Sequence, residues 1–128
     1  MSNPISNYLG VHAAALPLRE QRMQLIASNL SNADTPNFKA RDLDFQAALE
    51  QAAAKAAPLR NTNEQHMTLL NASPRIFERA GVQPSLDGNT VDADTERAAY
   101  GRAALEYRAS LSFIESKVRT MLTAITGQ

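Results

Sequence analysis

The chain of 128 residues has the length of a single domain, and its 13 basic side chains balance 13 acidic ones. This balance gives no overall charge that would draw the chain to nucleic acid or to an anionic membrane surface. Cysteine is absent, which excludes disulfides, thiolate metal sites and thiol catalysis.

Large apolar side chains are scarce. Tryptophan is absent, aromatic residues make up 5% of the chain, and alanine supplies much of the 44% that counts as hydrophobic. Because folding has to offset about 1–2 kcal/mol of conformational entropy per residue, we expect the chain to be poorly equipped to fold alone. No apolar run approaches the roughly 18 residues that span a bilayer. The N-terminus lacks a basic segment before a continuous apolar core, so no cleaved signal peptide is expected.

Residues 1–33 are predicted to form a long N-terminal helix that begins near Pro4. Two apolar series repeat every seven residues along it, which is typical of helical faces. The first series is Leu9, Leu16, Met23 and Leu30, and the second is Val11, Leu18 and Leu25. The two series lie about 200° apart around the helix, so neighbours are expected on both sides. Pro17 is expected to kink or break this helix because it removes a backbone hydrogen bond.

The end of this helix carries the stretch SNLSNADTPNF, residues 28–38. Asn29 and Asn32 lie three residues apart and therefore share one helical face, where their amides are placed to bond packed neighbours. The Thr35-Pro36 step that follows is expected to end the helix and redirect the chain.

The middle region, residues 34–91, is predicted to be mostly irregular. A short helix is expected from about Asp42 to Ala57, where Pro58 ends it. From Leu59 to Asn89 neither the helical nor the strand period persists, so extended chain and turns are expected.

Residues 92–128 are predicted to form a C-terminal helix with a heptad seam of about four repeats. Acidic residues at its start, including Asp92 and Glu96, suit the helix dipole. The seam consists of Tyr100, Ala104, Tyr107, Leu111, Ile114, Val118, Met121 and Ile125, and Phe113 and Leu122 lie off it. The expected fold is mainly α: long N- and C-terminal helices packed as an antiparallel coiled-coil-like pair, one structural unit with an irregular middle segment.

The sequence offers no constellation of residues for catalysis. His12 and His66 lie in different segments without partners at metal-ligand spacing, and no nucleotide-binding or hydrolase motif occurs. We therefore expect no catalytic, cofactor-binding or metal-binding residues, no small-molecule substrate and no nucleic acid partner.

The stretch at residues 28–38 resembles the N-terminal motif A-x-N-x-A-N-x-x-T-P-G-Y of the bacterial flagellar rod, hook and hook-associated proteins. Its fixed positions are occupied by Asn29, Asn32, Thr35 and Pro36. Asn37 and Phe38 stand where the family has Gly-Tyr. Asparagine tolerates the left-handed conformation better than other non-glycine residues, so the backbone of the motif is expected to be kept.

Three further segments resemble the proximal rod proteins of this family. ARDLDF at residues 40–45 follows the motif directly, and Thr62 and His66 match a T-x-x-x-H element. PSLDGNTVDADTER at residues 84–97 is similar to the family's sequence ahead of the C-terminal helix. The short chain length is also typical of a proximal rod protein.

The resemblance implies a structural subunit of the flagellar basal-body rod, the drive shaft for motility in the periplasmic space. It implies export by the flagellar type III apparatus and self-assembly through the terminal helices. The implied partners are copies of the chain, other rod proteins, the FliE-type adaptor between rod and MS ring, and the export gate.

On this interpretation the C-terminal seam packs on the Leu9 series within one subunit. Neighbouring subunits are expected to contact Val11, Leu18, Leu25, Phe113 and Leu122. Two alternatives stay open at this point: another proximal rod protein, and a soluble helical export chaperone or binding module.

Overall fold

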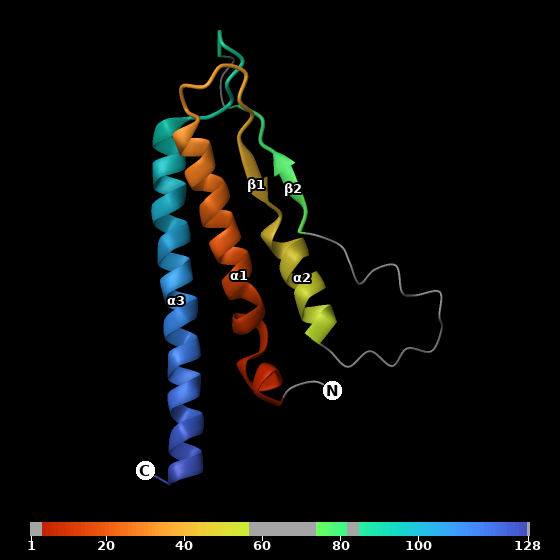
Figure 1. Cartoon of the computed structure of the whole chain (residues 1–128), viewed down its shortest axis with the longest axis vertical. Helices are drawn as coiled ribbons and strands as arrows, with labels where there is room; N and C mark the ends of the chain where they lie inside the picture. The colour runs from red at the N-terminus through yellow and green to blue at the C-terminus, as the bar shows by residue number, and fades with distance from the viewer. Residues whose placement is uncertain (1–3, 57–73, 82–84, 128) are drawn as a thin grey trace, which may run out of the picture.

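The computed structural model describes residues 4–56, 74–81 and 85–127, which form three helices and two short strands (Figure 1). In chain order these are α1 (Pro4–Ser31), β1 (Arg41–Leu43), α2 (Phe45–Ala56), β2 (Ile76–Glu78) and α3 (Ala93–Thr126). Helices α1 and α3 lie side by side, and β1, β2 and α2 lie on the other side of α1. The predicted helical fold with a paired N- and C-terminal helix is confirmed.

Helices α1 and α3 run antiparallel in a constant register. The His12 and Phe113 rings stack with centroids 4.6 Å apart, Arg19 pairs with Glu106 at 2.8 Å, and Asn29 bonds Glu96 at 3.2 Å. Along α1 the three contact residues are separated by seven and then ten positions. Their partners on α3 are separated by the same seven and ten positions in the opposite direction of the chain. Steps of seven and ten residues are close to two and three helical turns, so one face of each helix stays in contact.

The seam that α3 presents to α1 differs from the predicted one. Its buried residues, Glu96, Ala103 and Ser110, are spaced by seven but precede one of the predicted series by a single residue. Of that series, Ala104 is half-buried and Leu111, Val118 and Ile125 are exposed. Small side chains let the two helices approach closely, and pattern reading that favours large apolar residues overlooked them. The other series remains partly covered, with Tyr107, Ile114 and Met121 half-buried and Tyr100 exposed.

The opposite face of α1 is covered by β1 and α2. Leu18 is buried against Leu43 and Ala48, and Leu25 packs on the same cluster. The sequence had assigned Leu18 and Leu25 to contacts with neighbouring subunits, and the structure instead places them inside the subunit because the middle segment folds back over α1. Val11, Phe113 and Leu122 remain exposed, while Leu9, Leu16, Met23 and Leu30 are half-buried.

The irregularity in α1 falls at Gly10 rather than at Pro17. Gly10 has φ 57° and ψ −139°, outside the helical region, while Pro17 lies within the continuing helix. A residue with a side chain rarely adopts this positive φ, which glycine adopts freely. The first turns of α1 therefore change direction at Gly10.

The middle segment contains regular structure that the sequence pattern did not predict. β1 and β2 pair antiparallel, with Asp42 opposite Phe77, so α2 begins at Phe45 rather than at Asp42. Strands of three residues are too short for a period-2 pattern to be detected. Thr62 and His66, which carried part of the family resemblance, lie outside the described residues.

Helix α3 begins at a well-formed cap. The Asp92 side chain accepts hydrogen bonds from the backbone N–H groups of Asp94 at 3.0 Å and Thr95 at 3.2 Å. Hydrogen bonds from Thr95, and then from Asp94, hold the pKa of Asp92 below its ordinary value of 3.8.

This cap predicts a pH dependence at the start of α3. A lowered pKa in the folded state means that the cap's contribution is present above the unfolded pKa of 3.8 and is lost as the pH falls through the folded value. Amide NMR shifts of Asp94 and Thr95 should follow this titration. In an Asp92→Asn variant, which keeps a neutral acceptor, the amide shifts of Asp94 and Thr95 should not follow this titration. Shifts that titrate equally in both proteins would contradict the assignment.

Candidate functional site

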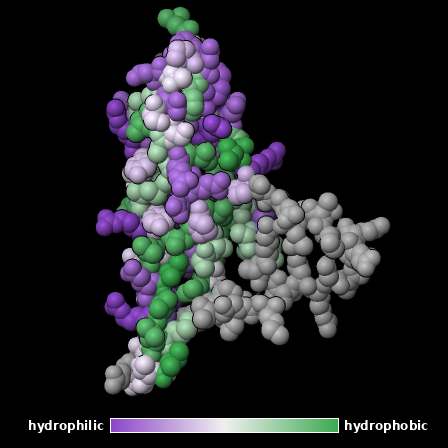
Figure 2. Space-filling model, in the orientation of Figure 1, coloured by the Kyte–Doolittle hydropathy of each residue, from purple (hydrophilic) through white to green (hydrophobic). Residues whose placement is uncertain are grey.

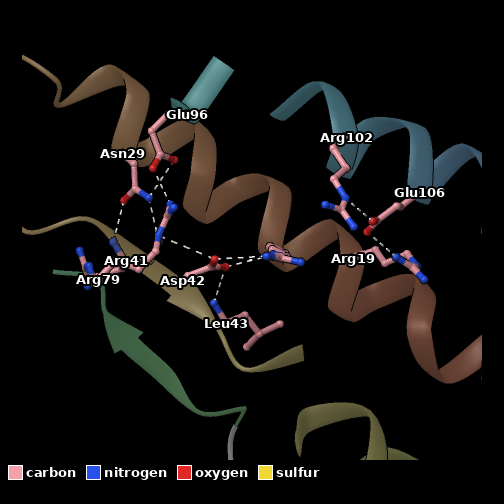
Figure 3. Close-up of polar contacts among 10 residues, drawn as sticks. Arg19, Asn29, Arg41, Asp42, Leu43, Arg79, Glu96, Arg102 and Glu106 are labelled. Atoms are coloured by element: carbon pink, nitrogen blue, oxygen red, sulfur yellow. Dashed lines mark hydrogen bonds and ion pairs between the residues drawn. The ribbon is translucent and has the colours of Figure 1, made fainter. Parts of the chain in front are cut away.

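The Asn29 side chain joins three parts of the chain at the end of α1 (Figure 3). Its amide Nδ2 donates to the Arg41 carbonyl at 2.8 Å and to Glu96 Oε2 at 3.2 Å. Its Oδ1 accepts from the Arg41 backbone N–H at 2.9 Å. Asn29 thus pairs with the backbone of β1 as a neighbouring strand would, while also holding α3. It is only 1% exposed, so these bonds form out of water.

Glu96 starts a chain of alternating charges beside Asn29 (Figure 3). Arg79, just after β2, forms an ion pair with Glu96, and its Nε lies 3.7 Å from Asp42 Oδ2. Asp42 in β1 in turn accepts from Arg22 of α1 at 3.1 and 3.3 Å. We call these four residues and Asn29 the polar joint.

The polar joint is neutral and largely enclosed. Its two carboxylates balance its two guanidinium groups, and both Asp42 and Glu96 are buried. A buried charge is costly unless it is paired and hydrogen-bonded. The joint therefore specifies one arrangement of α1, β1, the chain after β2, and α3.

A second asparagine closes the C-terminal end of α1. Asn89 is buried, and its Nδ2 lies 2.8–2.9 Å from the carbonyl oxygens of Asn32, Ala33 and Thr35. Its Oδ1 accepts from the Val91 N–H at 2.7 Å. These three carbonyls belong to the turn that follows α1, and a side chain from just before α3 donates to them.

The turn after α1 has the backbone that its sequence predicts. Asn37 has φ 62°, in the left-handed region, and its N–H donates to the Asp87 carbonyl at 2.8 Å. Gly88 packs against it so closely that a Cβ at Gly88 would lie 2.5 Å from Asn37 Oδ1. The expectation that Asn37 can stand at a glycine position is confirmed.

The predicted motif residues occupy different environments. Asn29 lies in the last turn of α1, whereas Asn32 follows the end of the helix, so the expectation that they share one helical face is wrong. Asn32 bonds locally, donating to the Ser28 carbonyl at 2.8 Å and accepting from Thr35 at 3.1 Å. Thr35 and Pro36 are exposed, and Phe38 is half-buried.

Sequence reasoning missed the partners that complete this site: Arg22, Asp42, Arg79, Asn89 and Glu96. Asn89 was interpreted only as a turn residue, and Glu96 only as a complement to the helix dipole. Glu96 sits seven residues before Ala103, and this heptad spacing was the available signal that it faces α1.

Within the described ranges, no group of His, Asp or Glu side chains is arranged to hold a metal ion. No helix in that part of the chain is long and apolar enough to span a bilayer.

Comparison with known proteins assigns the chain to a family. Residues 9–39, which include the motif and most of α1, match the family described as flagella basal body rod protein. A FlgB flagellar basal body rod protein of Aeromonas hydrophila is 43% identical over 122 residues, covering 93% of this chain and 92% of that protein. A protein of the same name from Cereibacter sphaeroides is 42% identical, and the match covers 94% of both chains. One from Escherichia coli K12 is 38% identical, and the match covers 87% of both chains.

The chain belongs to the FlgB family of flagellar basal body rod proteins. It is a structural subunit of the flagellar rod and serves motility. Membership of this family favours the rod interpretation over an export chaperone or binding module. FlgB proteins are structural rather than enzymatic as a family, and membership implies a place in the basal body and assembly with other rod components.

Asn29→Ala should destabilise the purified chain by about 1–3 kcal/mol, since it leaves the Arg41 backbone without its buried partner and removes one of the two donors to Glu96. Asn32→Ala is the matched control and should cost about 1 kcal/mol or less, because its bonds are local. Urea denaturation followed by circular dichroism measures both. Equal losses for the two variants would deny Asn29 its special role.

Replacement of Asn89 should loosen the end of α1. Asn89→Ala removes both the donor and the acceptor, at an expected cost of about 1–2 kcal/mol. Asn89→Asp keeps the acceptor for Val91 but turns an anion toward three carbonyls, so it should cost more than alanine. Hydrogen exchange at residues 28–35 should be faster in Asn89→Ala than in the unchanged protein, and faster still in Asn89→Asp. Slower exchange in Asn89→Asp than in Asn89→Ala would refute the proposed role of Asn89.

Proposed function

We propose that this subunit is held in the rod through the face of α3 that α1 leaves open. This face carries Leu111, Val118, Leu122 and Ile125, all exposed in the single chain. Figure 2 shows hydrophobic side chains gathered along the lower half of the molecule, where the second half of α3 lies. Contiguous exposed apolar surface on a soluble chain is typical of an interaction site.

The position of this face supports contact with a further helix. Leu111, Val118 and Ile125 recur every seven residues, so they form a straight row along α3. The half-buried row of Tyr107 and Ile114 lies between them and α1. Helix α3 is therefore apolar on two adjoining flanks, of which α1 covers one. Phe113 lies about 200° around α3 from Leu111 and stacks on His12, so Val11 and Phe113 are proposed to serve a separate contact.

For the motif we propose a role as an assembly joint. Asn29, Asn32, Thr35, Pro36 and Phe38 set the direction in which the chain leaves α1. The polar joint and the Asn89 cap support this role, since they hold α1, the following turn and the start of α3 in one arrangement. A rigid turn at this end keeps α1 and α3 aligned while α3 contacts a neighbour.

We further propose that the subunit passes through the flagellar type III export apparatus without a cleaved signal and functions in the periplasmic space. Its proposed neighbours are copies of itself, other rod proteins, the FliE-type adaptor and the export gate. Few large side chains are buried in the part of the chain that the structure describes, which supports this route because a small core is easily unfolded for export.

Leu111→Asp tests the proposed assembly face. Leu111 is 38% exposed, so the single chain should keep its helical content, whereas a carboxylate buried in the assembled contact should cost about 3–5 kcal/mol. Strains carrying this variant should export the protein but lack rods and motility. Electron microscopy of isolated basal bodies and swimming in soft agar measure these outcomes.

Ser112→Asp is the control, because it adds the same charge one residue further on at an exposed position. It should leave rods intact. Normal rods in the Leu111→Asp strain, or equal loss in both strains, would overturn the assignment of this face.

A further inference from the structure

The two most exposed large apolar side chains of the described residues lie at opposite ends of the molecule. Leu86 is 112% and Ile125 is 76% exposed. Leu86 belongs to the loop just before α3, and Ile125 to the last turn of α3. A helix of 34 residues is about 50 Å long, and Figure 1 shows that loop and the C-terminus at the two ends of the long axis.

Leu86 is presented by a braced turn. The Ser85 hydroxyl and the Asn89 N–H both bond Asp87 Oδ1, and the Asn37 N–H donates to the Asp87 carbonyl at 2.8 Å. The Gly88 carbonyl accepts from Lys39 Nζ at 2.7 Å. The backbone around Leu86 is thus fixed from several sides while its side chain points into solvent. Burying such a side chain contributes about 1.5–3 kcal/mol.

The other end offers a complementary surface. Leu122 and Ile125 lie three residues apart on one face of α3, and both are exposed. Arg119 precedes Leu122 by one turn and has no ion-pair partner in residues 4–56, 74–81 and 85–127. At the first end, hydrogen bonds from Ser85 and then Asn89 lower the pKa of Asp87, so this residue is an anion at neutral pH.

We propose that the Leu86–Asp87 turn of one subunit docks on Leu122, Ile125 and Arg119 of a second copy, so that subunits stack end to end. The inference rests on the proposed rod function and names a second contact, which takes Leu122 and Ile125 from the C-terminal end of the α3 face and leaves Leu111 and Val118 to the first contact. Two turns meeting face to face would bring two Asp87 anions together, and two helix ends would bring two Arg119 cations together. Contact between the turn of one subunit and the α3 end of another avoids both of these repulsions. Each subunit then keeps one free turn or one free α3 end, to which a further copy can bind.

Single cysteine variants test this contact, because the natural chain contains no cysteine. Leu86→Cys and Ile125→Cys are purified separately and then mixed under mild oxidation. The mixture should form about tenfold more disulfide-linked dimer than either variant alone, since docking raises the local concentration of the two thiols. Leu105→Cys is the control: Leu105 is also exposed on α3 but lies away from both ends.

Charge variants add a second readout. In the mixture, Arg119→Glu on the Ile125→Cys chain should remove most of the dimer, whereas Arg119→Lys should preserve it. Circular dichroism confirms that each variant keeps its helical content. Cross-linking of Leu86→Cys to itself, or yields no higher than with Leu105→Cys, would overturn the proposal. Should that happen while Leu111→Asp still abolishes rods, the end-to-end contact fails and the proposed assembly face stands.

Discussion

A buried carboxylate on α3 is the constraint around which this subunit is organised. Glu96 is 2% exposed, and a charge in that position must be matched by donors from the protein. The donors come from Asn29 on α1 and from Arg79 after β2. The match therefore exists only when the two long helices and the middle segment are all in place. Along the rest of the seam the buried residues are Ala103 and Ser110, and a buried polar residue such as Glu96 specifies the register of two packed helices.

This arrangement buries some faces of α1 and α3 within the subunit and leaves others exposed. One flank of α1 packs on α3, and another is covered by β1 and α2 around Leu18. The remaining apolar surface is concentrated on α3, including Leu111 and Ile125. Among residues 9–31 of α1, Val11 is the one exposed large hydrophobic side chain, so most of the exposed apolar surface of the two described helices lies on α3.

The sequence predicted those features that repeat over many residues. Seven-residue series revealed both terminal helices and their pairing, and the position of Asn37 in the motif predicted a left-handed turn. The features that the sequence did not predict depend on contacts between residues far apart in the chain. The three-residue strands carry no periodicity, and Asn89 meets carbonyls 54 to 57 positions away. The face assignment of Leu18 failed for the same reason, because only the folded middle segment shows what covers it.

The alternation of charges in the polar joint has a consequence for the conditions under which the subunit can work. Ion pairs at a protein surface weaken as dissolved salt screens them within about 10 Å, but buried pairs are screened much less. The carboxylate side chains of Asp42 and Glu96 are 9% and 3% exposed. Their partners Arg22 and Arg79 are 36% and 26% exposed, so these pairs are partly buried and are screened less than ion pairs at the surface. The arrangement of α1, β1 and α3 around the polar joint should therefore depend less on dissolved salt than the exposed Arg97–Asp94 and Arg102–Glu106 pairs do.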